Sequence, residues 1–137
     1  MYAVVLSLLR RRHRYPQDNI ALGAAGERVA RRFLKRLGYR ILGRNYRCPA
    51  GELDLIALDG ETIVFAEVRT RRDTTDNDPI DWVPPPKQRQ VAKVARYYIH
   101  HKNAHERPCR FDVLAVVLRD GHPPEVHHYP EAFTTDR

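Results

Sequence analysis

Apolar residues recur at helical spacing in two segments, residues 20–37 and 87–101, and predict two amphipathic helices. Asn19 is a suitable N-cap for the first helix, and Gly38 is a suitable stop after it. Pro86 suits the first turn of the second helix, because proline is pre-organised for that position. The apolar positions are Leu22, Gly26, Val29, Ala30, Phe33 and Leu37 in the first helix and Val91, Val94, Ala95 and Tyr98 in the second.

The other apolar runs are short and bounded by turn residues, which is typical of strands. An Asp-Gly pair at residues 59–60 separates two of these runs and indicates a β-hairpin. The order αβββαββ predicts one α/β domain with a mixed central sheet flanked by helices. The expected strands are residues 40–47, 51–58, 61–69, 111–118 and 125–129, and a polar, mobile loop is expected at 70–83.

The hairpin brings acidic residues together. A two-residue turn at the Asp-Gly pair sets Asp54 opposite Phe65, with Asp54 and Glu67 as diagonal neighbours roughly 7–8 Å apart at Cα. Side chains alternate between the faces of a sheet, so Glu52, Asp54, Glu67 and Arg69 share one face. Any turn of even length preserves this shared face, although the exact pairing moves.

Carboxylates are unusual in such apolar strands, since like charges repel across a strand pair and unpaired burial is costly. A hard cation with oxygen ligands would relieve both costs. The alternative is a solvated strand end, with the carboxylates paired to Arg47, Arg69 or Arg71. Glu27 lies at the edge of the apolar stripe of the first helix, where it either reaches over the sheet or pairs with Arg31 at i+4.

The 137 residues carry a formal net charge of +7, which suits a polyanionic partner such as nucleic acid. A basic surface kept for solubility and a membrane surface are the alternatives. Residues 1–17 combine a short apolar run with four arginines that follow it, the wrong order for a signal peptide. We therefore expect a poorly ordered basic arm before a single domain at residues 18–137. Two cysteines are too few for a disulfide framework and favour a cytoplasmic protein.

Several runs of residues together form a specific pattern: Gly26-Glu27, Gly38-Tyr39, Asn45, Gly51-Glu52-Leu53-Asp54-Leu55-Ile56-Ala57, Val64-Phe65-Ala66-Glu67-Val68-Arg69-Thr70-Arg71, Lys87 and Arg110-Phe111-Asp112-Val113. In this combination the chain resembles the YraN-type family. That family is similar to Holliday-junction resolvases and to the PD-(D/E)xK nuclease superfamily. The resemblance covers about residues 20–118 and implies a restriction-endonuclease-like αβββαβ core.

The resemblance also implies a metal site. It assigns metal ligation to Asp54, Glu67 and the backbone carbonyl of Val68, and Glu27 matches a first-helix glutamate of the resolvase-like branch. In such nucleases one or two Mg²⁺ ions, or Mn²⁺, activate water for attack on a phosphodiester. The chain departs from the superfamily where Arg69 replaces a lysine, because arginine stays charged and cannot be a general base. Lys87 is the candidate to substitute for that lysine.

The sequence thus favours a metal-dependent, resolvase-like nucleic-acid endonuclease, with DNA, branched or single-stranded, as the expected partner. The alternative is a non-catalytic nucleic-acid-binding module with a nuclease fold, which the arginine at position 69 favours. A basic protein-interaction domain explains the charge but not the carboxylates. Resolvases cut two strands symmetrically, so the resemblance to them also implies a homodimer. Nothing in the sequence indicates a small-molecule cofactor or a membrane. The expected phosphate-contacting residues are Arg47, Arg71, Arg72, Arg89 and Lys93.

Overall fold

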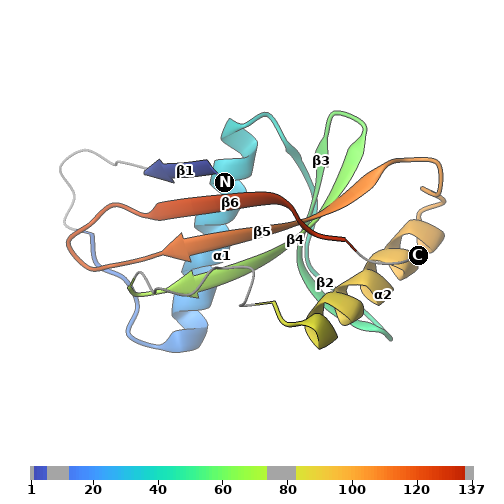
Figure 1. The fold of residues 1–137 in the computed structure, drawn as a ribbon. Coiled ribbons are helices and arrows are strands. Elements are labelled where there is room, and N and C mark those ends of the chain that lie inside the picture. Colours follow the sequence, from blue (N-terminus) through green and yellow to red (C-terminus); the bar gives the residue numbers. More distant parts are fainter. Residues whose placement is uncertain (1, 6–12, 74–82, 135–137) are drawn as a thin grey trace.

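The computed structural model describes residues 2–5, 13–73 and 83–134, which form a six-stranded sheet with helices packed on it (Figure 1). The strand order is β1-β6-β5-β4-β3-β2, and the sheet is mixed because β4 and β5 are parallel and the other pairs antiparallel. The predicted α/β fold is confirmed, and the segment from α1 to β5 has the αβββαβ order of a restriction-endonuclease-like core. The elements are β1 (Tyr2–Val5), α1 (Asn19–Arg36), β2 (Arg40–Cys48), β3 (Gly51–Asp59), β4 (Thr62–Arg71), α2 (Pro85–His101), β5 (Cys109–Val117) and β6 (Glu125–Phe133).

The two helices begin where local chemistry satisfies their first turns. Asp18 caps α1, since its side chain accepts a hydrogen bond from the backbone N–H of Ala21 at 2.9 Å. The predicted N-cap, Asn19, is instead the first helical residue. Pro84 precedes α2 and prolines occupy its first positions, where no backbone donor is needed.

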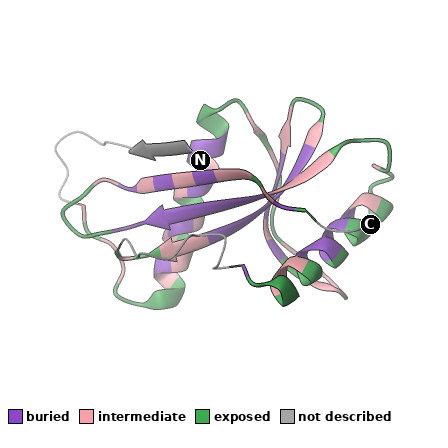
Figure 2. Ribbon diagram, in the orientation of Figure 1, coloured by how far each residue is buried: buried purple, intermediate pink, exposed green. Residues whose placement is uncertain are grey.

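Two apolar cores lie on opposite faces of the sheet, and Figure 2 shows buried residues concentrated along the central strands. Alternation along β4 divides its side chains between them, with Val64 and Ala66 in the core under α1 and Ile63 and Phe65 in the core under α2. β4 is central and covered on both faces, which explains its nearly continuous apolar sequence. Glu67 interrupts that sequence.

The turn of the β3–β4 hairpin consists of Gly60 and Glu61, so the prediction of an Asp59-Gly60 turn is wrong by one position. Asp59 remains in β3, where its carboxylate accepts a hydrogen bond from Arg110 Nη1 at 2.8 Å. Gly60 adopts a φ of +59°, which L side chains rarely adopt. The tertiary contact of Asp59 therefore prevails over the local preference of the Asp-Gly pair.

The shifted turn moves the strand pairing by two residues and preserves the faces. Leu55 pairs with Ala66, and continuing this register sets Asp54 opposite Glu67 instead of opposite Phe65. The two carboxylates are therefore direct cross-strand neighbours and not diagonal ones. Directly opposed Cβ atoms lie roughly 4.5–5.5 Å apart, so their electrostatic coupling is stronger than the sequence predicted.

Residues 2–5 form β1, a strand that the sequence analysis included in the arm and did not predict. β1 pairs antiparallel with β6. Tyr15 follows and is held against the β5–β6 turn, where its hydroxyl donates to the His122 carbonyl at 2.7 Å and its N–H donates to Asp120 Oδ1 at 2.8 Å. The arginines at positions 10–12 and most of the predicted loop, residues 74–82, lie outside the described residues.

A buried polar network joins β5 and β6. Asp112 is fully buried in β5 and accepts hydrogen bonds from His128 Nε2 at 2.8 Å, Arg110 Nε at 3.0 Å and the Glu131 N–H at 3.1 Å. Although burial raises the pKa of the Asp112 carboxyl, these hydrogen bonds outweigh it and lower the pKa below its ordinary value. Arg110 also donates to the Tyr39 hydroxyl at 2.6 Å. The Asp112 carboxylate is thus satisfied by protein groups and joins β5 to β6.

Helix α1 approaches β4 closely at Gly26. A Cβ atom on Gly26 would overlap the side chain of Thr70, far inside van der Waals contact. The same atom on Gly23, one turn earlier, would meet nothing within 4 Å. The absence of a side chain at Gly26 therefore lets Glu27, the next residue, lie against the sheet.

We predict that Gly26→Ala lowers the free energy of unfolding by about 1–3 kcal/mol, because the added methyl group overpacks the α1–β4 contact. Gly23→Ala is the matched control and should be neutral or stabilise the protein by up to about 1 kcal/mol, since alanine favours helix. Urea denaturation of both variants measures the difference. Equal effects of the two substitutions would show that close packing at Gly26 is not needed.

Candidate active site

The candidate site centres on Glu67, which lies in β4 on the face that carries α2. Its side chain is buried, with 1% of the residue exposed, and no partner in the described part of the chain bonds its Oε1 atom. Asp54 lies opposite on β3, and Asp54 Oδ2 accepts a hydrogen bond from the Val68 N–H at 2.9 Å. The backbone of β4 thereby orients the Asp54 carboxylate beside that of Glu67.

Two cations flank the Glu67 carboxylate, both predicted from the sequence as site residues. Arg69 Nη2 lies 3.6 Å and Lys87 Nζ 3.9 Å from Glu67 Oε2. Both side chains are largely buried. Lys87 comes from the first turn of α2 and also donates to Gln90 Oε1 at 3.3 Å, which holds it at the site.

Burial, and after it the neighbouring Asp54 carboxylate, raise the pKa of Glu67 to about 8. Lys87 and Arg69 lower this pKa but do not offset the desolvation. A hydrogen bond with Asp54 also raises the pKa of Glu67, because it favours the protonated form of Glu67. The carboxylate pair is thus electrostatically strained in the metal-free protein.

Glu27 approaches the pair from α1. The pKa of Glu27 is raised above its ordinary value by partial burial and by the Asp54 charge. A hydrogen bond from the Asn45 side chain and the charge of Arg31 lower it, but by less. Among the residues that the structure describes, no three His, Cys, Asp or Glu side chains gather closely enough to enclose a metal ion. Glu27 is therefore electrostatically coupled to Asp54, and its role as a ligand stays a prediction.

The donor set fits a hard divalent cation. Asp54 and Glu67 supply carboxylate oxygens, and Glu67 Oε1 is a buried acceptor without a hydrogen-bond partner in the described chain. Mg²⁺ is commonly bound by one or two carboxylates and keeps several of its waters, so this pair suffices without a third acidic ligand. A bound cation would also relieve the repulsion that raises the pKa of Glu67.

Two positioning residues were missed by the sequence analysis. Asn45 adopts a φ of +49° within β2, a conformation that asparagine tolerates better than most residues, and its side chain bonds Glu27. Gln90 of α2 packs over Gly51, where a Cβ atom would lie 2.6 Å from Gln90 Nε2. An asparagine in a strand and a glycine at a strand start were the only signals of these contacts.

The predicted phosphate-contacting arginines have varied surroundings. Arg72 donates hydrogen bonds to the carbonyls of Pro16 and Gln17, so it fastens the segment before α1. Exposed Arg47 lies 3.6 Å from Glu52. Arg71 borders a hollow of about 470 Å³ between α1 and the end of β4, which also contacts the site residues Glu27, Val68 and Arg69. Arg89 and Lys93 are exposed on α2.

Residues 26–116 match the family described as Uncharacterised protein family UPF0102. The chain belongs to this family. It is 47% identical over 116 residues to a UPF0102 protein of Geotalea uraniireducens, covering 85% of this chain and 91% of the relative. A UPF0102 protein of Geobacter sulfurreducens is 43% identical over 115 residues, 84% of this chain and 90% of the relative.

Membership of UPF0102 confirms the resemblance to the YraN-type family that the motifs indicated. The matched segment contains Glu27, Asp54, Glu67 and Lys87. It also contains Arg110 and Asp112 of the buried network, whereas His128 and Glu131 lie beyond the matched residues. Neither helix in the described part of the chain is long and apolar enough to cross a membrane.

The pKa of Glu67 makes a prediction about stability. Between the ordinary value of 4.5 and the folded value of about 8, the folded protein retains a proton that the unfolded chain has lost. The free energy of unfolding should therefore fall as pH rises through this window, by at most about 1.4 kcal/mol per pH unit. Glu67→Gln mimics the protonated acid and should remove this fall, making the variant the more stable protein at pH 8.

Urea denaturation in EDTA at pH 5, 6.5 and 8 measures this effect. Glu52→Gln is the control, because Glu52 is an exposed acid on the same hairpin and should leave the pH dependence unchanged. Parallel pH profiles for the wild type and Glu67→Gln would contradict the burial account.

Proposed function

We propose that the protein is a metal-dependent nucleic-acid endonuclease that hydrolyses phosphodiester bonds in a resolvase-like manner. The observation that supports this most directly is the Asp54–Glu67 pair, in which Glu67 is buried, has a carboxylate oxygen without a hydrogen-bond partner in the described chain and is flanked by two cations. A buried carboxylate next to a second carboxylate weakens a fold unless it binds something, and a phosphodiester with Mg²⁺ or Mn²⁺ supplies the matching chemistry. The net charge of +7 supports DNA as the polyanionic partner.

Each residue has a distinct role in the proposed reaction. Asp54, Glu67 and the Val68 carbonyl would hold the metal ion, which when bound supplies Lewis-acid stabilisation and an activated water. Arg69 stays protonated, so it stabilises negative charge that develops on the phosphate. Lys87 reaches the same carboxylate from α2 and is the candidate to orient the attacking water. Glu27 would hold water on the α1 side of Asp54.

A non-catalytic nucleic-acid-binding module is the second candidate, and Arg69 in place of the superfamily lysine favours it. Arginine provides charge but no proton acceptor. In that case the carboxylate pair would bind a metal ion that bridges to phosphate without cleavage. The two candidates share DNA as partner and differ in whether the bound strand is cut. A symmetric homodimer, expected from the resemblance to resolvases, fits either candidate.

We predict Mg²⁺- or Mn²⁺-dependent cleavage of branched or single-stranded DNA that Asp54→Asn and Glu67→Gln each reduce by about 100-fold or more. Both substitutions keep side-chain size and remove a charged ligand. Gel-based cleavage assays with and without EDTA measure this. Glu52→Gln, on the same hairpin and more exposed, should retain activity. Cleavage that survives loss of Asp54 would mean that the chemistry lies elsewhere.

Metal binding has a readout that does not depend on activity. A metal ion that binds only the folded state raises the melting temperature. Mg²⁺ should therefore stabilise the wild-type protein at pH 8 and release protons from the carboxylate pair, whereas Glu67→Gln should respond weakly. Metal-induced stabilisation without cleavage would favour the binding module.

Arg69→Lys tests the departure from the superfamily. If Arg69 acts only through charge, lysine should preserve or increase the cleavage rate, because it can also release a proton. If the arginine fork grips phosphate or Glu67 through two donors, the rate should fall. Single-turnover kinetics at several pH values distinguish the two, since a lysine that acts as a base adds a pH-dependent step.

A further inference from the structure

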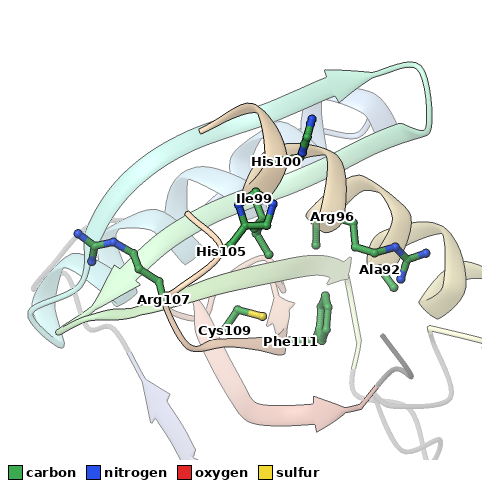
Figure 3. Close-up of a pocket in the computed structure, with 9 residues that line it drawn as sticks. Ala92, Arg96, Ile99, His100, His105, Arg107, Cys109 and Phe111 are labelled. Atoms are coloured by element: carbon green, nitrogen blue, oxygen red, sulfur yellow. The ribbon is translucent and has the colours of Figure 1, made fainter. Parts of the chain in front are cut away.

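A second hollow lies between α2 and the start of β5, on the same face of the sheet as Glu67 (Figure 3). Its volume is about 360 Å³, at the lower end of the range of about 300–1,000 Å³ for small-ligand pockets. Ala92, Ala95 and Ile99 of α2 and Phe111 of β5 supply apolar walls. The Phe111 ring is held between Phe65 and Phe133, with centroids 5.8 and 5.2 Å away. The floor of the hollow is thus aromatic and packed against neighbouring rings.

The charged side chains that line this hollow are cationic, and no described acidic side chain borders it. Arg96 and Arg107 lie on different sides of the hollow and extend away from each other (Figure 3). A depression of similar volume, about 380 Å³, adjoins it at Ala92 and Arg96. No described acidic side chain lines this depression, and Arg89 and Lys93 add two cations. The basic surface therefore continues from the hollow along α2 toward Lys87 at the beginning of the helix.

We propose that this hollow receives one unpaired nucleotide of a nucleic-acid strand. The base enters the apolar slot, and the phosphates on its two sides contact Arg96 and Arg107. The strand continues past Lys93 and Arg89 toward the carboxylate pair. The proposal rests on the proposed function for its polymer class and adds the site that selects unpaired substrate.

Chemistry favours a strand over a small free ligand. Cations on two sides of an apolar slot match a polyanion that enters and leaves, whereas a small ligand needs its charge neutralised at one end. Apolar walls accept the face of any base, so the site would recognise that a base is unpaired but not which base it is. Inserting a paired base costs a few kcal/mol of unpairing, which a bulged or single-stranded base avoids.

The position of the hollow fixes where such a base lies relative to the metal site. Arg96 and Lys87 are nine residues apart on α2, a rise of about 13 Å along the helix axis. A strand that places an unpaired base in the hollow therefore presents a phosphate a few nucleotides away to Lys87 and Glu67. The hollow would act as a substrate-selecting site next to the proposed chemistry.

The test uses a DNA duplex with a single bulged 2-aminopurine and the same duplex fully paired, both titrated in EDTA so that nothing is cut. We expect the bulged DNA to bind about 5- to 100-fold more tightly, with a rise in 2-aminopurine fluorescence as the base leaves the stack. Ile99→Trp, which fills the hollow, should reduce this preference to about twofold or less while binding of the paired duplex is unchanged.

A charge-matched pair of variants guards against misfolding of Ile99→Trp. Arg96→Gln/Arg107→Gln removes two exposed cations at the hollow, and Arg32→Gln/Arg36→Gln removes two exposed cations from α1. The first should weaken bulge binding about 10-fold more than the second, because only it touches the flanking phosphates.

Several outcomes overturn the proposal: equal binding of the two duplexes, a bulge preference that survives Ile99→Trp, or equal effects of the two double variants. Thymidine monophosphate that binds as tightly as the bulged strand would also overturn it, in favour of a small-molecule pocket. A hollow-dependent bulge preference without any cleavage supports this inference and defeats the endonuclease. Cleavage with no bulge preference supports the endonuclease and overturns this inference.

Discussion

Burial of the Glu67 carboxylate beside Asp54 is the constraint on which the functional part of this structure depends. Burying a single carboxylate is costly, and a second carboxylate directly across the strand pair adds repulsion. Together these two effects raise the pKa of Glu67 to about 8. Proteins rarely retain such a pair for stability, because apolar residues of similar size would hold the sheet at lower cost. Around it, Lys87, Arg69 and the Val68 N–H offset part of the cost.

A second acidic group in the same sheet has the opposite electrostatics, and the contrast is informative. Asp112 is equally buried, yet hydrogen bonds from His128, Arg110 and a backbone N–H satisfy it and lower its pKa. The hydrogen bonds of the Asp112 carboxylate are complete without any added ligand, as expected of a structural anchor. Glu67 has cations nearby at 3.6 and 3.9 Å but keeps an oxygen without a partner in the described chain. Glu67, and not Asp112, is therefore the candidate for the proposed chemistry.

The sequence predicted the helices, the core strands and the shared face of Asp54 and Glu67, because each depends on local periodicity. It misplaced the hairpin turn, since the Asp59–Arg110 ion pair joins residues 51 positions apart and leaves no local trace. It also missed β1, because four apolar residues at an edge carry no periodic signal. Asn45 and Gln90 were invisible as positioning residues, since their partners lie on other elements. The family motifs named the candidate ligands, and only the fold showed which residues position them.

Helix α2 connects the two parts of the proposed activity. Its first turn supplies Lys87 to the carboxylate pair, and its last turns line the hollow at Ile99 and Arg96. The helix packs rigidly on the sheet through Val91, Val94 and Ala95, so the separation between the two regions is fixed by the fold. A rigid spacer of this kind converts recognition of an unpaired base into a defined cleavage position, without a loop that must close. Selectivity for DNA structure and the position of cutting would then follow from one helix and its length.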